Sequence, residues 1–319
     1  MARLIGGEEM DQAMTLRQMR EQTNPERAEA KVTFLENRRQ ADQGVKVFSI
    51  TSGKGGVGKT HIVVNLAFAL RRLGARVMIF DADLGLANVD VLLGLTPQCN
   101  IQHVLDGQKS LEEILIEGPE GIIILPASSG VQDLVDLSES QQLQLLAELD
   151  SLERDIDILL VDTGAGISSN VMYFNVAAQE IIVVVTPEPT SITDAYALMK
   201  VLATKYAEKH FKVLLNAVSD AVEAKEVFRR LSLVAERFLD ISIDYLGFIV
   251  YDPAFSKAVR RQKALLDLYP HSAAGRCFQQ LARHLMEIPE VTYPKGNIQF
   301  FWKRLLTRRS QPSPLFSDR

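Results

Sequence analysis

Short apolar runs alternate with longer amphipathic stretches between residues 46 and 287. The runs lie at 47–50, 77–80, 122–125, 158–161, 181–185, 213–215 and 245–250. Because they are almost continuously apolar, they predict strands that helices cover on both faces. The stretches 62–73 and 138–152 predict helices, and Ser138 followed by Gln141 has the pattern of a capping box. The alternation therefore predicts a doubly wound α/β fold with a mostly parallel sheet.

The two ends of the chain lack this alternation. Residues 1–44 are charged and rich in Gln and Arg, with few aliphatic residues. We expect a flexible arm there, with one helix around 11–21. Pro289 and Pro294 predict a linker after the last core helix. The chain is thus expected to have three parts: the arm at 1–44, an α/β domain at 45–288, and a linker, short helix and tail at 289–319.

A glycine-rich segment follows the first predicted strand and leads into the helix at 62–73. Its glycines let backbone N–H groups surround phosphate oxygens, and the helix N-terminus adds positive dipole. In this pattern Lys59 contacts the β- and γ-phosphates, and the Thr60 hydroxyl binds Mg²⁺. The alternative, a simple glycine-rich turn, does not require the order strand, loop, Lys-Thr and helix. The predicted nucleotide ligands are Gly53, Lys54, Gly55, Gly56, Val57, Gly58, Lys59, Thr60 and His61.

Two other predicted strands end in aspartates. Asp81 and Asp83 follow the run 77–80, and Asp162 follows the run 158–161. In a doubly wound sheet the ligand lies beyond the carboxyl ends of the strands, so these carboxylates should converge on the glycine-rich loop. Asp162 is placed to hold a Mg²⁺-bound water, and either Asp81 or Asp83 could orient the attacking water. Each aspartate taken alone is equally consistent with a helix N-cap.

Composition and charge exclude several classes of protein. The chain has 319 residues and a formal net charge of −5, so it has no global footprint for nucleic-acid binding. Cys99 and Cys277 are far apart, and the five histidines form no H-x-x-x-H pair, which excludes a disulfide framework and the common zinc sites. No apolar run approaches the roughly 18 residues of a membrane span. We expect a cytoplasmic protein with reduced thiols.

Lys54 distinguishes this loop from an ordinary phosphate loop. Residues 54–60 read K-G-G-V-G-K-T, and from 46 to 287 the chain resembles the MinD/ParA ATPases, the deviant Walker A type of P-loop NTPase. The resemblance implies ATP and Mg²⁺ as cofactors, ATP hydrolysis, and a homodimer that encloses two ATP molecules. It also implies that Lys54, Lys59 and Asp83 are catalytic. In that family the residue at Lys54 reaches the partner's nucleotide, and the residue at Asp83 orients the attacking water.

The same resemblance implies further ligands. Asp81 would contact the metal or the signature lysine, so the expected metal set is Thr60, Asp81 and Asp162. Asn216 follows a later strand at the position that contacts adenine in relatives.

Three stretches, 81–95, 126–130 and 188–196, are similar to flagellar number and placement regulators of the FlhG/FleN type. Residues 11–17 read D-Q-A-M-T-L-R, which is similar to an N-terminal element of that subfamily. The resemblance implies that this element docks on the flagellar FlhF-type GTPase and that Gln12 stimulates GTP hydrolysis, since a neutral amide can orient a water beside a γ-phosphate. The alternative is a solvated arm helix. Flagellar transcription regulators and switch-complex proteins are further partners in the subfamily, and no residue here identifies one.

The segment 297–309 predicts a short amphipathic helix. Residues at i, i+3, i+4, i+7 and i+8 form its apolar face: Ile298, Phe301, Trp302, Leu305 and Leu306. Cationic residues lie on or beside its polar face, as in helices that bind membrane surfaces. The segment also resembles the C-terminal membrane-targeting sequence of MinD-like proteins, which implies reversible binding to the anionic inner face of the cell membrane. The alternative is a terminal helix docked on its own domain.

These features favour a regulatory ATPase that controls flagellar number or placement through dimerisation, membrane association and GTPase stimulation. The nearest alternative is a cell-division-site or chromosome/plasmid-partitioning ATPase with the same core. Partitioning proteins bind DNA through basic surfaces. The cluster Arg260, Arg261 and Lys263 is small and fits a solvated helix face, so we do not expect DNA as a partner.

Overall fold

The computed structural model describes residues 45–84, 88–127, 137–152 and 156–288. The predicted arm with Gln12 and its helix at 11–21 lies outside these ranges. So do the linker and the predicted membrane-binding face of residues 298–306. Within the described ranges, no helix combines the length and the apolar character that a bilayer crossing requires.

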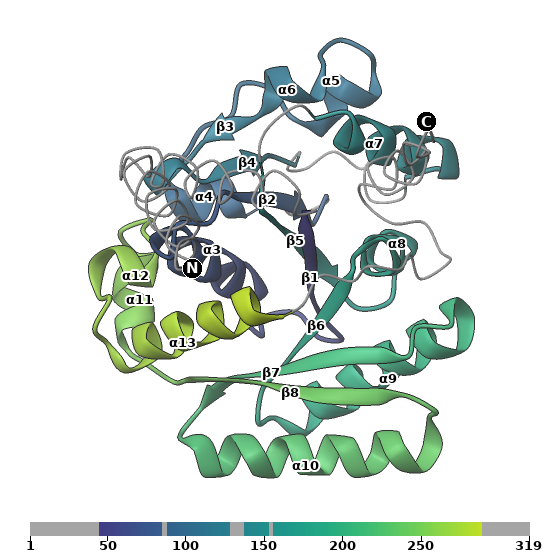
Figure 1. Ribbon diagram of the computed structural model, residues 1–319, viewed down its shortest axis with the longest axis vertical. Helices are drawn as coiled ribbons and strands as arrows, with labels where there is room; N and C mark the ends of the chain where they lie inside the picture. The colour runs from purple at the N-terminus through teal and green to yellow at the C-terminus, as the bar shows by residue number, and fades with distance from the viewer. Residues whose placement is uncertain (1–44, 85–87, 128–136, 153–155, 289–319) are drawn as a thin grey trace, which may run out of the picture. The chain divides into compact units, whose positions relative to one another are not determined.

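The described chain forms an eight-stranded sheet in the order β3-β4-β2-β5-β1-β6-β7-β8, parallel except for β3 (Figure 1). The strands are β1 (Lys46–Ser52), β2 (Val77–Ala82), β3 (Ile116–Glu117), β4 (Ile123–Leu125), β5 (Ile158–Ala165), β6 (Glu180–Val185), β7 (His210–Val218) and β8 (Ser242–Val250). Every predicted strand is confirmed, with ends that differ by a few residues. Only β3 was not predicted, because two residues are too few to show a period.

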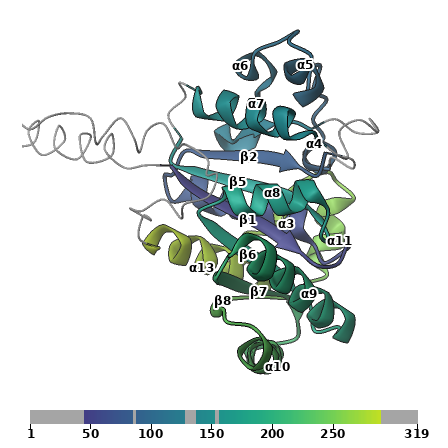
Figure 2. The same cartoon turned by 90° about the vertical axis from the view of Figure 1, so that its right-hand side faces the viewer.

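Helices cover both faces of the sheet, which confirms the doubly wound prediction (Figures 1 and 2). They are α3 (Lys59–Arg72), α4 (Val89–Leu93), α5 (Ile101–Leu105), α6 (Leu111–Ile114), α7 (Glu139–Asp150), α8 (Ser169–Ala177), α9 (Pro189–Tyr206), α10 (Ala221–Phe238), α11 (Ala254–Val259), α12 (Leu265–Leu268) and α13 (Ala273–Glu287), with a short 3₁₀ turn at Pro119–Gly121. The capping box of α7 is confirmed: Ser138 Oγ accepts from the Gln141 N–H, and Gln141 Oε1 accepts from the Ser138 N–H at 2.9 Å.

Burial on both faces explains why the strands are almost continuously apolar. In β6, Ile182 and Val184 pack into a core that also contains α3 and α13. Ile181, Val183 and Val185 point the other way and pack with α8, α9 and α10. All five side chains are fully buried. A strand in the middle of this sheet therefore has no face exposed to solvent, and a polar residue in it needs a partner inside the protein.

The last described helix is fastened to the first strand. Lys46, at the start of β1, donates from Nζ to the carbonyl oxygens of Met286 at 2.9 Å and Ile288 at 2.6 Å. These carbonyls belong to the C-terminal turn of α13, where helix carbonyl groups lack intrahelical donors. The lysine thus caps α13 and fixes where the chain leaves the domain.

Gly53 gives a test of how closely the loop after β1 packs on α9. A Cβ at residue 53 would lie 2.1 Å from the backbone C and O of Asp194 in α9, whereas a Cβ at Gly55 would meet nothing within 4 Å. We expect Gly53→Ala to lower the free energy of unfolding by about 1–3 kcal/mol, the usual cost of overpacking. Gly55→Ala is the control and should change it by less than about 0.5 kcal/mol. Urea denaturation without nucleotide measures both, and equal midpoints would contradict the prediction.

Candidate functional site

The glycine-rich loop between β1 and α3 is clasped to the end of β7. Gly58 has φ +92°, and a Cβ there would lie 2.7 Å from Asn216 Nδ2. Asn216 donates from Nδ2 to the Val57 carbonyl at 2.7 Å. Both the backbone conformation and the close approach require glycine at this position. The predicted nucleotide ligands Val57, Gly58 and Asn216 therefore lie together.

Buried hydrogen bonds connect β1 to α8 and to the start of the glycine-rich loop. Ser49 Oγ donates to Asn175 Oδ1 at 2.8 Å, and Asn175 Nδ2 donates to Thr51 Oγ1 at 3.1 Å. At the end of β1, Ser52 Oγ donates to the Lys54 carbonyl at 2.7 Å and accepts from Lys59 Nζ at 3.1 Å. We call this set, Ser49, Thr51, Ser52 and Asn175, the β1 polar network. Its members are buried, so each hydrogen bond stabilises polar groups that water cannot reach.

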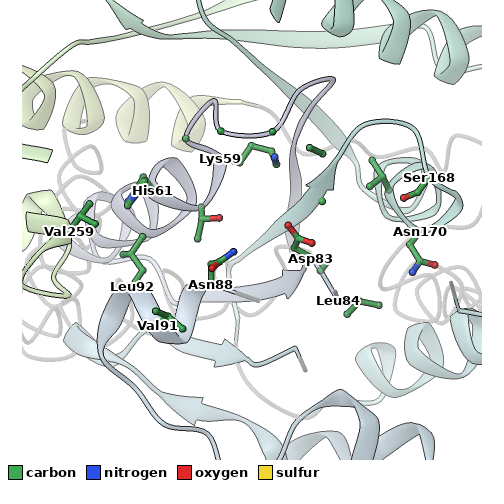
Figure 3. Close-up of a pocket in the computed structure, with 18 of the residues that line it drawn as sticks. Lys59, His61, Asp83, Leu84, Asn88, Val91, Leu92, Ser168, Asn170 and Val259 are labelled. Carbon is green, nitrogen blue, oxygen red and sulfur yellow. The ribbon is translucent and has the colours of Figure 1, made fainter. Parts of the chain in front are cut away.

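A cavity of about 980 Å³ opens beyond the carboxyl ends of β1, β2 and β5. Lys59 and Asp83 border the same space in Figure 3, with Asn88, Val91 and Leu92 on one wall. Among the predicted site residues, those that line it are Gly55, Gly56, Gly58, Lys59, Thr60, His61 and Asp83. The predicted convergence of the loop and Asp83 is therefore observed.

Lys59 places a positive charge inside this cavity. Its side chain is 8% exposed and lies at the start of α3. Burial lowers the pKa of Lys59, whereas the carboxylates of Asp162 and Asp83 act in the opposite direction. A buried ammonium group between N–H groups and carboxylates suits a polyphosphate that carries its own cation.

Asp162 lies within β5, beside Thr60, and is 1% exposed. Burial raises the pKa of Asp162 to about 7, although the Thr60 hydroxyl hydrogen bond and the Lys59 charge oppose the shift. Its Oδ1 atom is buried and has no hydrogen-bond partner among the described residues. Mg²⁺ prefers oxygen ligands, which bind it directly or through a water. Here a carboxylate oxygen that accepts no hydrogen bond from the described residues lies next to a hydroxyl oxygen. The residues present therefore fit Mg²⁺.

Asp81 is engaged differently. Its Oδ1 accepts from the Asp83 N–H at 3.3 Å, and its Oδ2 accepts from the N–H groups of Asn88 at 3.0 Å and Val89 at 3.1 Å. Burial raises the pKa of Asp81, and the nearby Asp162 carboxylate adds to the shift. The carboxylate thus caps the start of α4, which is the alternative weighed for a strand-end aspartate. Its metal role stays a prediction.

Lys54 lies outside the cavity that Lys59 lines. Its ammonium group pairs with Glu188, and Nζ donates to Thr190 Oγ1 at 3.1 Å, at the N-terminus of α9. Both members of the ion pair are substantially exposed, at 37% and 62% of their side chains. Gly53 also faces α9 rather than the cavity.

A second cavity, of about 460 Å³, shares Gly58 and His61 with the first. Asn216, His61, Tyr251, Asp252 and Phe255 are among the residues that line it. The His61 and Phe255 rings meet edge to face at 6.0 Å, and burial lowers the pKa of His61. Tyr251 is 70% exposed, so its ring offers a surface for a base to stack on.

Sequence reasoning missed Tyr251 and Phe255. The available signal was a pair of aromatic residues directly after the last strand, at the carboxyl edge where ligands bind.

The fold and the loop geometry define a P-loop nucleotide-binding protein. The sequence pattern described as AAA domain matches residues 45–215. The chain is 46% identical over 262 residues to the antiactivator FleN of Pseudomonas aeruginosa, which covers 82% of this chain and 94% of that protein. It is 36% identical over 265 residues to the flagellum site-determining protein YlxH of Helicobacter pylori, with coverage of 82% and 90%.

Solved structures agree with this relationship. The septum site-determining protein MinD of Pyrococcus horikoshii, complexed with Mg-ADP, superposes with a TM-score of 0.64 at 26% identity, covering 76% of this chain and 97% of that one. The cell division ATPase MinD of Pyrococcus furiosus has the same fold, with a TM-score of 0.66 at 24% identity and coverage of 77% and 100%. The chain belongs to the MinD/ParA ATPases and, within them, to the family of FleN and YlxH. It is an ATPase with ATP and Mg²⁺ as its cofactors.

Asp162→Asn tests the fit for Mg²⁺. The amide keeps the size of the side chain and an acceptor for Thr60, but it removes the charge that attracts the cation. We expect ATP without Mg²⁺ to raise the melting temperature of the variant as it does in the wild type, because bound ligand stabilises the folded state. The additional rise on adding Mg²⁺ should disappear. The control is Asp157→Asn, just before the opposite end of β5, and the same Mg²⁺ increment in Asp162→Asn as in the wild type would contradict the assignment.

Proposed function

We propose that this ATPase controls flagellar number or placement, as a switch that dimerises on ATP, binds the membrane and stimulates a flagellar FlhF-type GTPase. The observation that carries the proposal is the 46% identity to the antiactivator FleN, together with the similarity to the flagellum site-determining protein YlxH. The alignments cover 94% and 90% of those two relatives and 82% of this chain, which supports a shared role.

The residues of the site support a division of tasks. Lys59 would bind the β- and γ-phosphates, while Thr60 and Asp162 would hold Mg²⁺, which offsets phosphate charge when bound. Asp83 would orient the attacking water from the rim of the cavity. Asn216, with the second cavity beside it, would receive the adenine base.

The placement of Lys54 supports the dimer. In the single chain its ammonium group rests on the surface against Glu188, away from the phosphate cavity. An exposed ion pair of this kind is worth only about 0–1 kcal/mol. Lys54 can therefore leave Glu188 at little cost and reach the nucleotide of a second copy.

Dimerisation would also explain membrane binding. Each cationic residue close to anionic lipid contributes about 1 kcal/mol, so the single short helix predicted at 297–309 would bind weakly. Two such helices on one particle raise the avidity by roughly 10²–10⁴. ATP binding would thus recruit the protein to the inner face of the membrane, and hydrolysis would release it into the cytoplasm.

A division-site or partitioning role is the second candidate. The similarity of the core to the septum site-determining protein MinD of Pyrococcus horikoshii favours it. The N-terminal element at 11–17 separates the two candidates, because stimulation of a flagellar GTPase belongs to the first alone.

Gln12→Ala in the full chain tests the GTPase-activating role. We expect the wild-type protein to accelerate GTP hydrolysis by the cognate FlhF-type GTPase, and Gln12→Ala to lose that acceleration because no amide orients the water. Gln18→Ala, a second glutamine of the arm, is the matched control and should behave as the wild type. Phosphate release is the measurement. If the wild type gives no stimulation, the division or partitioning role moves ahead.

A truncated chain, 1–293, tests membrane recruitment. We expect it to hydrolyse ATP but to lose ATP-dependent sedimentation with liposomes that contain anionic lipid, because the apolar face at 298–306 is gone. A chain of residues 1–309, which lacks only the tail, should sediment like the full-length protein. Undiminished sedimentation of 1–293 would exclude this route to the membrane.

A further inference from the structure

Helix α4 follows Asp83 in the chain and lines the larger cavity. Residues from distant parts of the sequence form hydrogen bonds to this helix. At its start, Asp81 Oδ2 accepts the N–H groups of Asn88 and Val89. Further along the helix, Gln262 Nε2 donates to the Val91 carbonyl at 3.0 Å. The stem of Gln262 also lies against the end of α4, since a Cβ at Gly94 would be 3.6 Å from Gln262 Cβ.

Gln262 occupies a backbone position at which a side chain is costly. It has φ +50°, in the left-handed region that favours glycine. The Gln262 N–H donates to the Val259 carbonyl at 2.9 Å, and the next N–H donates to the Ala258 carbonyl at 3.2 Å. These bonds close the end of α11, and glycine is the usual residue at such a helix end. At this strained position the side chain of Gln262 reaches across to α4, where its amide group donates to Val91.

The bond joins the walls of two cavities. Phe255 and Val259 of α11 border the cavity beside Asn216, and Val259 also borders the larger cavity. Val91, Leu92 and Gln262 border the larger cavity that contains Asp83. Figure 3 shows Val259 and His61 close to Leu92 and Val91, on the side of the cavity away from Ser168 and Asn170. A displacement of α11 by a base would therefore reach α4 through Gln262.

We propose that Gln262 is a positioning residue for ATP hydrolysis, which ties α4 to the turn after α11 and makes the alignment of Asp83 depend on occupancy of the base cavity. The inference rests on the proposed role of Asp83 as the residue that orients water. Asp81 links the two, because the same carboxylate accepts the N–H of Asp83 and the N–H groups at the start of α4.

Two substitutions in the full chain remove the bond in different ways. Gln262→Met keeps the length of the side chain but has no donor, and Gln262→Gly removes the side chain while it relaxes the backbone. We expect both to lower kcat by about three- to tenfold, as for the loss of one hydrogen bond, with KM for Mg²⁺-ATP unchanged. ATP turnover per protein molecule is compared at protein concentrations above which it no longer increases. A change in dimer affinity is then not mistaken for a change in the rate of hydrolysis.

Two further variants complete the design. Ala207→Gly relaxes another left-handed residue, with φ +59° at the end of α9 and far from the site, and should leave kcat unchanged. Asp83→Ala should lower kcat by about 10²-fold or more, the effect of losing a group that assists proton transfer or orients water. Hydrogen exchange of the α4 amides gives a readout besides activity: ADP should protect them in the wild type and less so in Gln262→Met.

Each outcome has one meaning. Wild-type kcat in both Gln262 variants, with Asp83→Ala impaired, would overturn the role of Gln262 and leave that of Asp83 intact. A slow Gln262→Gly beside a normal Gln262→Met would also overturn it, because loop freedom rather than the hydrogen bond would be the cause. A rise in KM at constant kcat would make Gln262 a binding residue only. An Asp83→Ala protein that turns over normally would remove the proposed role of Asp83 and, with it, the route through α4.

Discussion

The β1 polar network is the constraint on which the nucleotide site depends. β1 lies between β5 and β6 and is covered on both faces, so its hydroxyl groups can be satisfied only by neighbours in the protein. Asn175 of α8 satisfies two of them, and the loop itself satisfies Ser52. These hydrogen bonds satisfy the buried hydroxyl groups of β1. Those of Ser52 also fix the start of the glycine-rich loop and the position of the Lys59 ammonium group.

Charge in the cavity is balanced only in part by the protein. Asp162 and Asp83 face Lys59, and burial raises the pKa of Asp162 while it lowers that of Lys59. In both cases the cause is burial, which disfavours the charged form of the side chain. A magnesium nucleotide brings both anionic oxygens and a cation. Its binding would therefore stabilise the charged forms of Lys59 and Asp162 together. This arrangement links affinity for the nucleotide to the presence of the metal.

Local sequence patterns predicted much of the fold and the glycine-rich loop. They did not predict the contacts between residues that are far apart in the sequence. The strands were visible because burial on both faces leaves continuous apolar runs, and the loop was visible because Gly58, Lys59 and Thr60 are adjacent in sequence. The two-residue β3 has no period to detect. Tyr251 lines a cavity with Asn216, and Gln262 donates to Val91. These neighbours are far away in sequence, so no local pattern predicts the contacts. Asp81 shows the same difficulty, since strand-end aspartates that cap a helix and those that bind a metal look alike in sequence.

The cap that Lys46 places on α13 also determines where the two ends of the described domain lie. It brings residue 288, where the C-terminal segment departs, to the beginning of β1, directly after the N-terminal segment ends. Both extensions thus start from one corner of the domain, separated from the glycine-rich loop by the length of β1, about 20 Å. The described domain therefore has both of its chain ends at the edge of the sheet that lies opposite the nucleotide cavity. The edge that carries the glycine-rich loop and Asp83 carries neither of these chain ends.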